Sequence, residues 1–191
     1  MTIYIIEHLE PELWEWCALE YEHISQIVGK ENLWFTNVKE KSKNAKKLEK
    51  LGKVFVESVS KLNLTNACVL DPEAGKMLEP GEAGKFDYMI FGGILGDYPP
   101  RKRTKQELTS KFKNAEARNI GKEQMSTDNA VYAVKQIAEG KKLFDLKFQD
   151  EIEIKTGEKE SVILPYRYVL INGKPLISKK LVEYLKNKKG F

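Results

Sequence analysis

Short β-rich apolar runs alternate with helical segments along the first half of this chain. The runs occupy Thr2 to Ile6, Asn32 to Val38, Ala67 to Leu70 and Phe86 to Phe91. Between the first two runs, apolar residues from Leu13 to Val28 recur at steps of three and four, which is typical of an amphipathic helix. Strands separated by helices pair in parallel, so the alternation predicts an α/β fold with a mainly parallel sheet and helices on both faces.

The remaining segments give weaker signals until the tail. Helices are predicted over Lys39 to Leu51, Glu107 to Asn114 and Ser126 to Ala138, whereas the pattern of Val54 to Leu62 indicates no definite structure. From Lys147 to Ile177 apolar and polar residues alternate, as in β-hairpins, and a helix follows. We therefore expect a main domain over residues 1–144 and, over residues 145–191, a small β-rich extension packed on it.

Charge is distributed unevenly along the chain. The formal net charge of +4 over 191 residues is too small to indicate nucleic-acid binding by itself. The segment EHLEPELWEWCALEYE is acidic, however, whereas KEKSKNAKKLEKLGK and RKRTKQELTSKFK are basic. Two positive faces make a polyanion or a ribonucleoprotein surface a plausible partner.

Cysteine content and hydropathy exclude several classes of protein. Cys17 and Cys68 are the two cysteines, and no cluster of Cys and His has the spacing of a zinc site, so we expect neither a disulfide framework nor a metal. The sequence contains no run of eighteen apolar residues and no basic, signal-like N-terminus, so we expect no membrane span. The expected location is the cytoplasm.

Ligands of parallel sheets bind beyond the carboxyl ends of the strands, which directs attention to the residues that follow each run. Glu7 and His8 follow the first run, and Asp71 and Pro72 follow the third. The fourth is followed by the most unusual stretch of the chain, FGGILGDYPPRKRT, Phe91 to Thr104.

Glycines in this stretch predict close contact between the main chain and a ligand. Gly92, Gly93 and Gly96 allow a positive φ and a close approach, while Asp97 adds a fixed acceptor. The pattern is neither GxGxxG nor a P-loop, so an ordinary dinucleotide or nucleotide fold is not indicated. The double proline that follows Tyr98 holds the basic residues away from the sheet.

A second loop of similar composition, NIGKEQMSTD over Asn119 to Asp128, precedes the predicted helix at Ser126 to Ala138. Its glycine, amide, hydroxyl and acidic groups can face the same pocket. The alternative for both loops is a plain surface turn with solvated charges.

Four segments together resemble a known family. EHLEPELWEWCALEYEHI, VLDPEAGKMLEP, FDYMIFGGILGDYPPRKRT and NIGKEQMSTDNAV, in this order, are similar to an archaeal and eukaryotic family in the SPOUT superfamily of S-adenosylmethionine-dependent methyltransferases. The resemblance runs from Ile3 to about Ile137. Members are described as predicted RNA methyltransferases, and the eukaryotic branch as protein arginine methyltransferases that act on a small-subunit ribosomal protein.

The resemblance implies a C-terminal trefoil knot in which three loops surround S-adenosylmethionine. These loops are Asp71 to Gly75, Gly92 to Tyr98 and Asn119 to Asp128. The predicted cofactor-binding residues are Asp71, Pro72, Gly92, Gly93, Ile94, Leu95, Gly96, Ile120, Gly121, Gln124, Met125 and Thr127. The chain departs from the family's PPRDRT pattern at Lys102, so a carboxylate role at that position does not carry over.

Methyl transfer from a sulfonium depends mainly on alignment of donor and acceptor and needs no metal. The predicted catalytic residues are Asp97, Glu7 and Arg101. Asp97 is suited to bind the cofactor or to take a proton from the acceptor, although an aspartate here can equally cap the turn. An acid in the first turn of a helix, such as Asp128, is stabilised by the helix dipole whatever its function.

Two acceptors remain open at this stage. Arg101, Arg103, His8 and Glu20 are the predicted acceptor-binding residues. A guanidinium needs carboxylates such as Glu7, Glu20 or Asp97, whereas an RNA acceptor in rRNA or tRNA needs the arginines and nearby lysines for its phosphates. The alternative to an enzyme is an RNA-binding or ribosome-binding module with a vestigial cofactor pocket. Whether the protein is a monomer or a homodimer also stays open.

Overall fold

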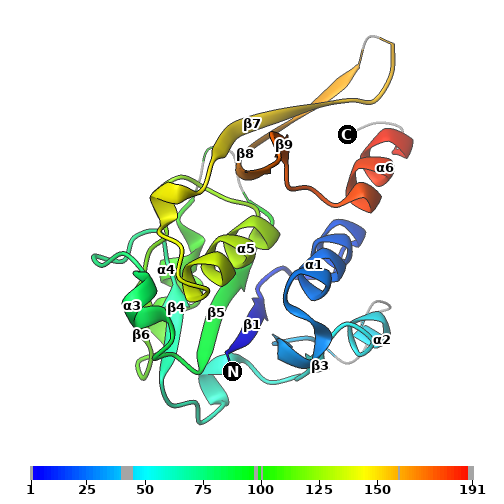
Figure 1. Cartoon of the computed structure of the whole chain (residues 1–191). Coiled ribbons are helices and arrows are strands. Elements are labelled where there is room, and N and C mark those ends of the chain that lie inside the picture. Colours follow the sequence, from blue (N-terminus) through cyan, green and yellow to red (C-terminus); the bar gives the residue numbers. More distant parts are fainter. Residues whose placement is uncertain (1, 40–44, 97–98, 100, 159, 189–191) are drawn as a thin grey trace.

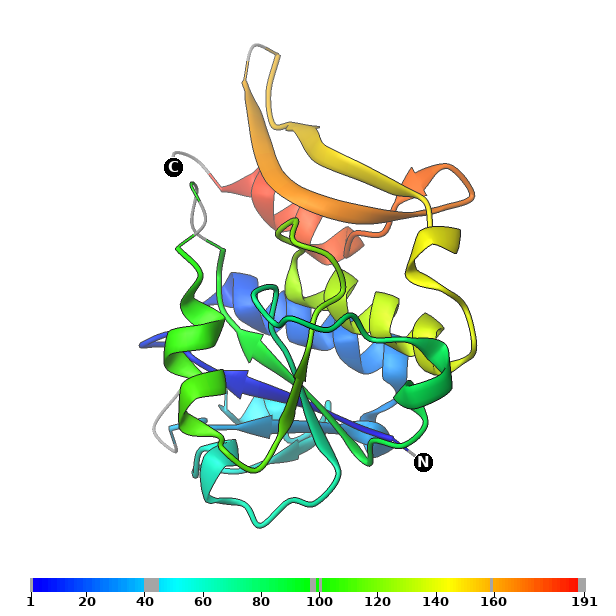
Figure 2. The same cartoon turned by 90° about the vertical axis from the view of Figure 1, so that its left-hand side faces the viewer.

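The computed structural model describes residues 2–39, 45–96, 99, 101–158 and 160–188. Its centre is a six-stranded sheet in the order β3-β2-β1-β5-β4-β6 (Figures 1 and 2). The strands are β1 (Ile3–His8), β2 (Leu33–Thr36), β3 (Lys53–Val54), β4 (Ala67–Leu70), β5 (Tyr88–Gly93) and β6 (Glu116–Arg118). Every neighbouring pair runs parallel, as predicted.

Helical segments cover both faces of this sheet. The helices of the first part are α1 (Glu15–Val28), α2 (Ala45–Leu48), α3 (Pro80–Ala83), α4 (Arg103–Glu107) and α5 (Thr127–Ala138). On one face Ile6 and Phe91 pack in a core with residues of α1 and α5. On the other, Ile5 and Ile90 pack in a core with Val59 of the 3-10 helix Val59–Lys61 and with Leu108 and Phe112, which flank the 3-10 helix Thr109–Lys111. The predicted α/β class with two covered faces is confirmed.

The C-terminal part forms a second, antiparallel sheet (Figure 1). It contains β7 (Phe148–Lys155), β8 (Ser161–Ile171) and β9 (Lys174–Pro175), and α6 (Lys179–Asn187) follows. The turn between β8 and β9 holds Asn172 at φ 52° and Gly173 at φ 76°, the backbone conformation that favours Asn-Gly in tight hairpins. This confirms the predicted β-rich extension.

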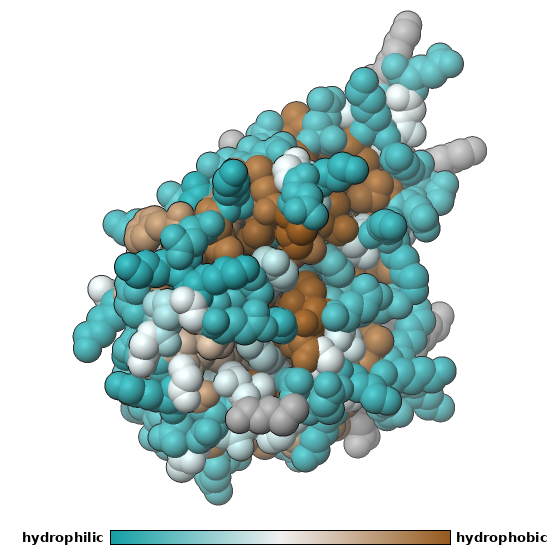
Figure 3. Space-filling model, viewed as in Figure 1, coloured by the Kyte–Doolittle hydropathy of each residue, from teal (hydrophilic) through white to brown (hydrophobic). Residues whose placement is uncertain are grey.

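The extension contacts helices of the first part. Leu164 of β8 and Leu185 of α6 share a buried cluster with Trp16 and Leu19 of α1. Figure 3 shows apolar residues gathered over the extension and between α1 and α5. The division at residue 144 into a domain and an extension stays a prediction, as does the knot.

Several boundaries differ from the prediction. The helix expected over Glu107 to Asn114 is wrong, because α4 ends at Glu107 and the chain turns at Leu108, with φ −123° and ψ −66°, into a 3-10 helix. Within the described part of Lys39 to Leu51, the helix covers Ala45–Leu48, and residues 40–44 lie outside the described residues. β3 and β6, at two and three residues, are too short to give a clear pattern.

Candidate active site

The loops after β4 and β6 are joined directly. These strands are neighbours, so their carboxyl ends lie at one edge of the sheet. Asp71 donates its main-chain N–H to Arg118 O at 2.9 Å, and Asn119 Nδ2 donates to Ala74 O at 2.8 Å. Asn119 also forms a parallel bridge with Met77. Two of the three predicted loops therefore form one continuous wall.

The loop after β5 meets the same wall. A Cβ placed on Gly96 would collide with Gln124 Nε2, which shows how closely the two segments approach. On the same side, Tyr166 of β8 donates its hydroxyl to Gly96 O at 2.8 Å, and Arg167 N donates to Gln124 O, also at 2.8 Å. The structure therefore brings the three predicted loops together and adds β8, which the sequence did not indicate.

The positive φ that the sequence allows at Gly92, Gly93 and Gly96 does not occur in the structure. Among described residues, Gly92, Gly93 and Gly96 are not in the positive-φ region, whereas Gly121 is, at φ 96°. At Gly93, an added Cβ would meet the Tyr21 hydroxyl and would lie 2.9 Å from Ile6 Cγ2. Gly93 is therefore required by close packing against α1, and Gly96 by close packing between loops.

The cofactor implied by the family resemblance, S-adenosylmethionine, fits the residues of these loops. Leu95 and Met125 are half-buried apolar side chains at the edge of the core, suited to a flat base. Main-chain N–H and C=O groups of the loops lie beside these side chains and can bind the polar edges of the base. Gly96 has no side chain that would obstruct a ligand next to Gln124.

The other predicted cofactor residues are distributed around the same edge. Asp71 is buried and accepts from Glu73 N at 2.9 Å and from Thr109 Oγ1 at 2.7 Å, so it orders its own turn. Ile120 and Thr127 are buried, whereas Pro72 is exposed. Gly92 and Ile94 are half-buried.

Glu7 and His8 occupy the end of β1. Glu7 is buried, and its Oε2 accepts from Thr36 Oγ1 at 2.5 Å and from Val59 N at 2.9 Å. These hydrogen bonds connect β1 to β2 and to the 3-10 helix Val59–Lys61. His8 pairs in the sheet with Gly93, and its Nδ1 lies 2.9 Å from the Tyr21 hydroxyl. Burial lowers the pKa of His8, which favours a neutral imidazole.

His8 and Gly93 flank the point where the sheet changes direction. From β1 the chain leads to β2 on one side, whereas from β5 it leads to β6 on the other. In open α/β sheets this switch point is the usual position of a ligand cleft. The three loops and the end of β1 are thus positioned by topology.

Two buried acidic residues, Glu20 of α1 and Asp128 of α5, lie on helices that pack against each other. Glu20 accepts from Trp16 Nε1 at 2.8 Å. Burial raises the pKa of Glu20 to about 8, and the negative charge of Asp128 adds to the effect. Asp128 Oδ2 lies 2.7 Å from His23 Nδ1, and its Oδ1 accepts from Ser126 Oγ at 2.6 Å. Sequence reasoning missed Trp16 and His23, which helical spacing alone does not distinguish from core residues.

The basic residues after the prolines differ in their exposure and in their contacts. Arg101 is exposed. Lys102 has φ 56° and donates from Nζ to Glu73 Oε1 at 2.6 Å. Arg103 is half-buried between Glu107 and Glu10, whose carboxylates raise the pKa of its guanidinium further above the ordinary value. Asp97 and Tyr98 lie outside the described residues, so the structure does not place the predicted carboxylate there.

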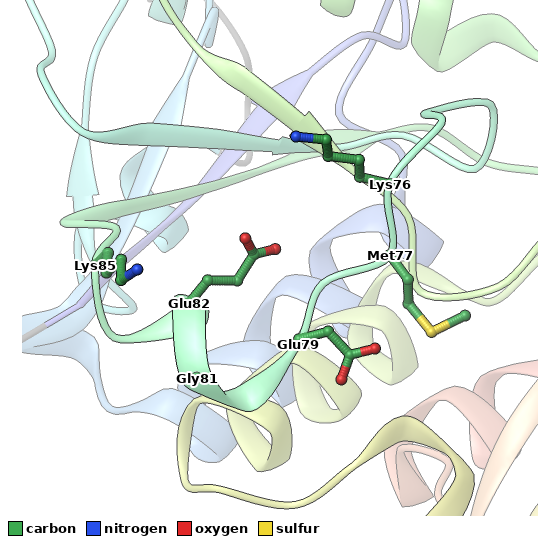
Figure 4. Close-up of a pocket in the computed structure, with 6 residues that line it drawn as sticks. All are labelled: Lys76, Met77, Glu79, Gly81, Glu82 and Lys85. Carbon is green, nitrogen blue, oxygen red and sulfur yellow. The ribbon is translucent and has the colours of Figure 1, made fainter.

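Two pockets lie on other parts of the described surface. One of about 470 Å³ is lined by Lys76, Met77, Glu79, Gly81, Glu82 and Lys85 beside α3 (Figure 4). Another of about 460 Å³ lies beside α2 and β3. Neither is lined by a predicted site residue. In the described residues, no helix is long and apolar enough to cross a membrane, and no group of three His, Cys, Asp or Glu side chains is arranged to hold a metal ion.

Known proteins match this chain along nearly its whole length. Residues 3–190 match the family described as protein arginine N-methyltransferase SFM1-like. The protein arginine N-methyltransferase SFM1 of Saccharomyces cerevisiae is 38% identical over 199 residues, which cover 96% of this chain and 93% of the yeast protein.

Solved structures agree with the family match. The yeast SFM1 structure with SAH is 36% identical, with a TM-score of 0.86, and covers 96% of this chain and 94% of the yeast chain. The yeast SFM1 structure with SAM is 37% identical, with a TM-score of 0.85, and covers 97% of this chain and 90% of the yeast chain. The Trm10 structure from Thermococcus kodakaraensis, a SPOUT protein, is 18% identical with a TM-score of 0.54, covers 75% of this chain and 96% of its own, and supports the predicted fold alone. The chain belongs to the SFM1-like family of protein arginine N-methyltransferases.

Proposed function

We propose that this protein transfers a methyl group from S-adenosylmethionine to a guanidinium nitrogen of an arginine side chain in a protein. The match to the arginine methyltransferase family over residues 3–190 carries the proposal, because it includes the three loops, α1 and the extension. Yeast SFM1, solved with SAM and with SAH, is similar over the same length. The predicted methyltransferase class thereby has support from sequence and from structure.

S-adenosylmethionine supplies an electrophilic methyl carbon on its sulfonium. The protein's part is to hold the two reactants in line, which in well-oriented systems is worth about 7 to 11 kcal/mol. The Gly96 and Gln124 segments form the rigid wall for the donor, and the Tyr166 hydroxyl fixes the Gly96 carbonyl. Thr127 starts α5 immediately after this wall, so the first turn of α5 lies next to it.

Buried acids beside the cleft match the chemistry of a guanidinium. Glu20 and Asp128 are both buried, although only Asp128 pairs with a histidine among the described residues. Two neighbouring acids in a site of low polarity disfavour their joint ionisation, which adds to the effect of burial on the pKa of Glu20. An arriving guanidinium relieves this repulsion, and an ionised Glu20 orients it by charge-assisted hydrogen bonds. Trp16, bonded to Glu20, offers a half-buried aromatic ring beside it.

As part of the same proposal, the acceptor arginine belongs to a ribosome-associated protein in the cytoplasm. Arg101, Lys102, Lys105, Lys111 and Lys113 are all exposed along α4 and the following 3-10 helix. Such a surface suits the phosphates of rRNA next to a protein acceptor. The lysines steer the approach, whereas the carboxyl groups select the reacting side chain.

The test is transfer of an isotope-labelled methyl group from S-adenosylmethionine into whole ribosomes, followed by separation of RNA from protein. We expect label in protein, as methylarginine after hydrolysis. Glu20→Gln should bind S-adenosylmethionine normally and transfer little label. Label in RNA would contradict the proposed acceptor, and absence of transfer to either fraction would contradict the proposed function.

A further inference from the structure

Beyond the last main-chain contact between β1 and β5, a partly buried ion pair links the loop after β1 to α4. Leu9 N donates to Gly93 O at 3.1 Å, which closes the sheet at this edge. One residue further along, the side chain of Glu10 makes the next contact with this loop, because its Oε1 accepts from Leu95 N at 2.9 Å. The carboxylate of Glu10 thus holds the main chain of the predicted cofactor loop at Leu95, next to Gly96.

The same oxygen of Glu10 also accepts from Arg103. Arg103 Nη1 donates to Glu10 Oε1 at 2.7 Å, and the Glu10 side chain is 6% exposed. A carboxylate so far from water needs such a partner, because an unpaired buried charge is strongly unfavourable. Arg103 therefore supplies that partner and holds the Glu10 side chain oriented toward Leu95.

Arg103 in turn is fixed by α4. Its Nε donates to Glu107 Oε1 at 2.7 Å and its Nη2 to Glu107 Oε2 at 3.3 Å, a forked contact one helical turn away. Nη2 also donates to Leu9 O at 3.3 Å. One guanidinium thereby joins the loop after β1 to α4, and through Glu10 to the loop after β5. We call the pair of Glu10 and Arg103 the clamp.

We propose that the two clamp residues, Glu10 and Arg103, are positioning residues that hold residues 94–96 in the conformation required to bind S-adenosylmethionine. The inference rests on the proposed function, and it gives Arg103 a different role from acceptor binding. The described contacts direct its guanidinium to Glu10, Leu9 and Glu107 of the same chain. Glu10 was not singled out from the sequence, because a glutamate before Pro11 in an acidic segment has no distinctive spacing.

The test compares S-adenosylmethionine binding by the full-length protein and its variants in calorimetry, without an acceptor. Removing a hydrogen bond to a charged group costs about 1.5 to 3 kcal/mol, so we expect Glu10→Ala and Arg103→Gln each to weaken binding by at least about 10-fold. The double variant should be no weaker than the poorer single variant, because both act through one contact at Leu95. Glu10→Gln keeps an acceptor for Leu95 N but loses the ion pair, and should fall between Glu10→Ala and the wild type.

The matched control is Glu139→Gln. Glu139 also accepts from two side chains, Lys135 at 2.6 Å and Gln136 at 2.7 Å, but at the far end of α5. We expect the affinity of Glu139→Gln for S-adenosylmethionine to stay within about twofold of that of the wild type. In turnover assays the clamp variants should raise the KM for S-adenosylmethionine more than they lower kcat.

Melting temperatures separate positioning from a general loss of folding. Unchanged affinity in Glu10→Gln and Arg103→Gln, with a lower melting temperature, would overturn the inference. So would strictly additive losses in the double variant. If the wild type binds S-adenosylmethionine but methylates no arginine, the proposed function fails while the clamp stands. If the wild type does not bind it, both fail.

Discussion

Among single residues, Glu20 connects the stability of the fold to its chemistry. Its pKa is raised from 4.5 to about 8 by burial and by Asp128. Because the folded protein binds this proton more tightly than the unfolded chain, the resulting stabilisation is complete below about pH 4.5. It is lost as the pH rises through about 8. The same proton must leave before Glu20 can pair with a guanidinium.

Glu20→Gln should therefore separate stability from activity. We expect a melting temperature several degrees above that of the wild type at pH 9, and a smaller difference at pH 5, since about 1 kcal/mol corresponds to roughly 2–4 °C in a chain of this size. Methyl transfer by the wild type should increase between pH 6 and pH 9, whereas the variant should show little transfer at any pH. Equal melting temperatures for both proteins at pH 9 would show that Glu20 is not protonated by burial.

Gly93 gives a second prediction at the same scale. A Cβ at this position would meet the Tyr21 hydroxyl, so Gly93→Ala should lower the free energy of unfolding by about 1–3 kcal/mol in urea titrations. Tyr21→Phe removes the obstructing oxygen, and the double variant should regain part of the loss. Gly75→Ala is the control, because nothing lies within 4 Å of the added Cβ. A double variant less stable than Gly93→Ala would contradict this explanation.

Individual residues also show where sequence reasoning reached its limit. Asp71 and Gly96 were predicted to share a site because each follows a predicted strand, and parallel strands end at one edge. Gln124 was predicted from the composition of its loop and from the family resemblance. Trp16, His23 and Glu10 were missed. His23 of α1 contacts Asp128 of α5, and Glu10 contacts Leu95 of the loop after β5. Both partners are tens of residues away in the sequence, and no local pattern shows which distant residue a side chain will meet.

At the scale of elements, β8 supports the loops after β5 and β6. Its Tyr166 and Arg167 bond to Gly96 and Gln124, and Asn129 of α5 accepts from Val169 N at 2.8 Å. The extension is therefore linked by hydrogen bonds to two of the predicted cofactor loops and to α5. Alternation in the sequence predicted this hairpin, but not what its side chains would contact.

Tyr166→Phe tests that support with the loss of one oxygen. We expect S-adenosylmethionine affinity to fall by about 3- to 10-fold, because the hydrogen bond to Gly96 O contributes roughly 1 kcal/mol to the loop's bound conformation. The melting temperature should change little, as the ring remains in place. Tyr184→Phe on α6 serves as the control. Unaltered affinity in calorimetry would mean that β8 only covers the loops.

The whole molecule combines an α/β sheet with an extension over α1 and α5. Its class and parallel pairing were predictable, since apolar runs such as Ala67–Leu70 are buried throughout and stand between helical segments. β3 and β6 were not predictable, because two or three residues are too few to show an alternation of apolar and polar side chains. These strands form by pairing with β2 and β4, respectively. The sequence resemblance predicted the family, which the match over residues 3–190 confirms.

The central claim is that the buried acids beside the three loops select an arginine side chain. The most direct measurement is mass-spectrometric mapping of the methyl group after reaction of the protein, deuterated S-adenosylmethionine and ribosomes. The account predicts a labelled guanidinium nitrogen in one peptide, and its loss with Glu20→Gln. Label on a nucleotide, or on arginine to the same extent with Glu20→Gln, would contradict it.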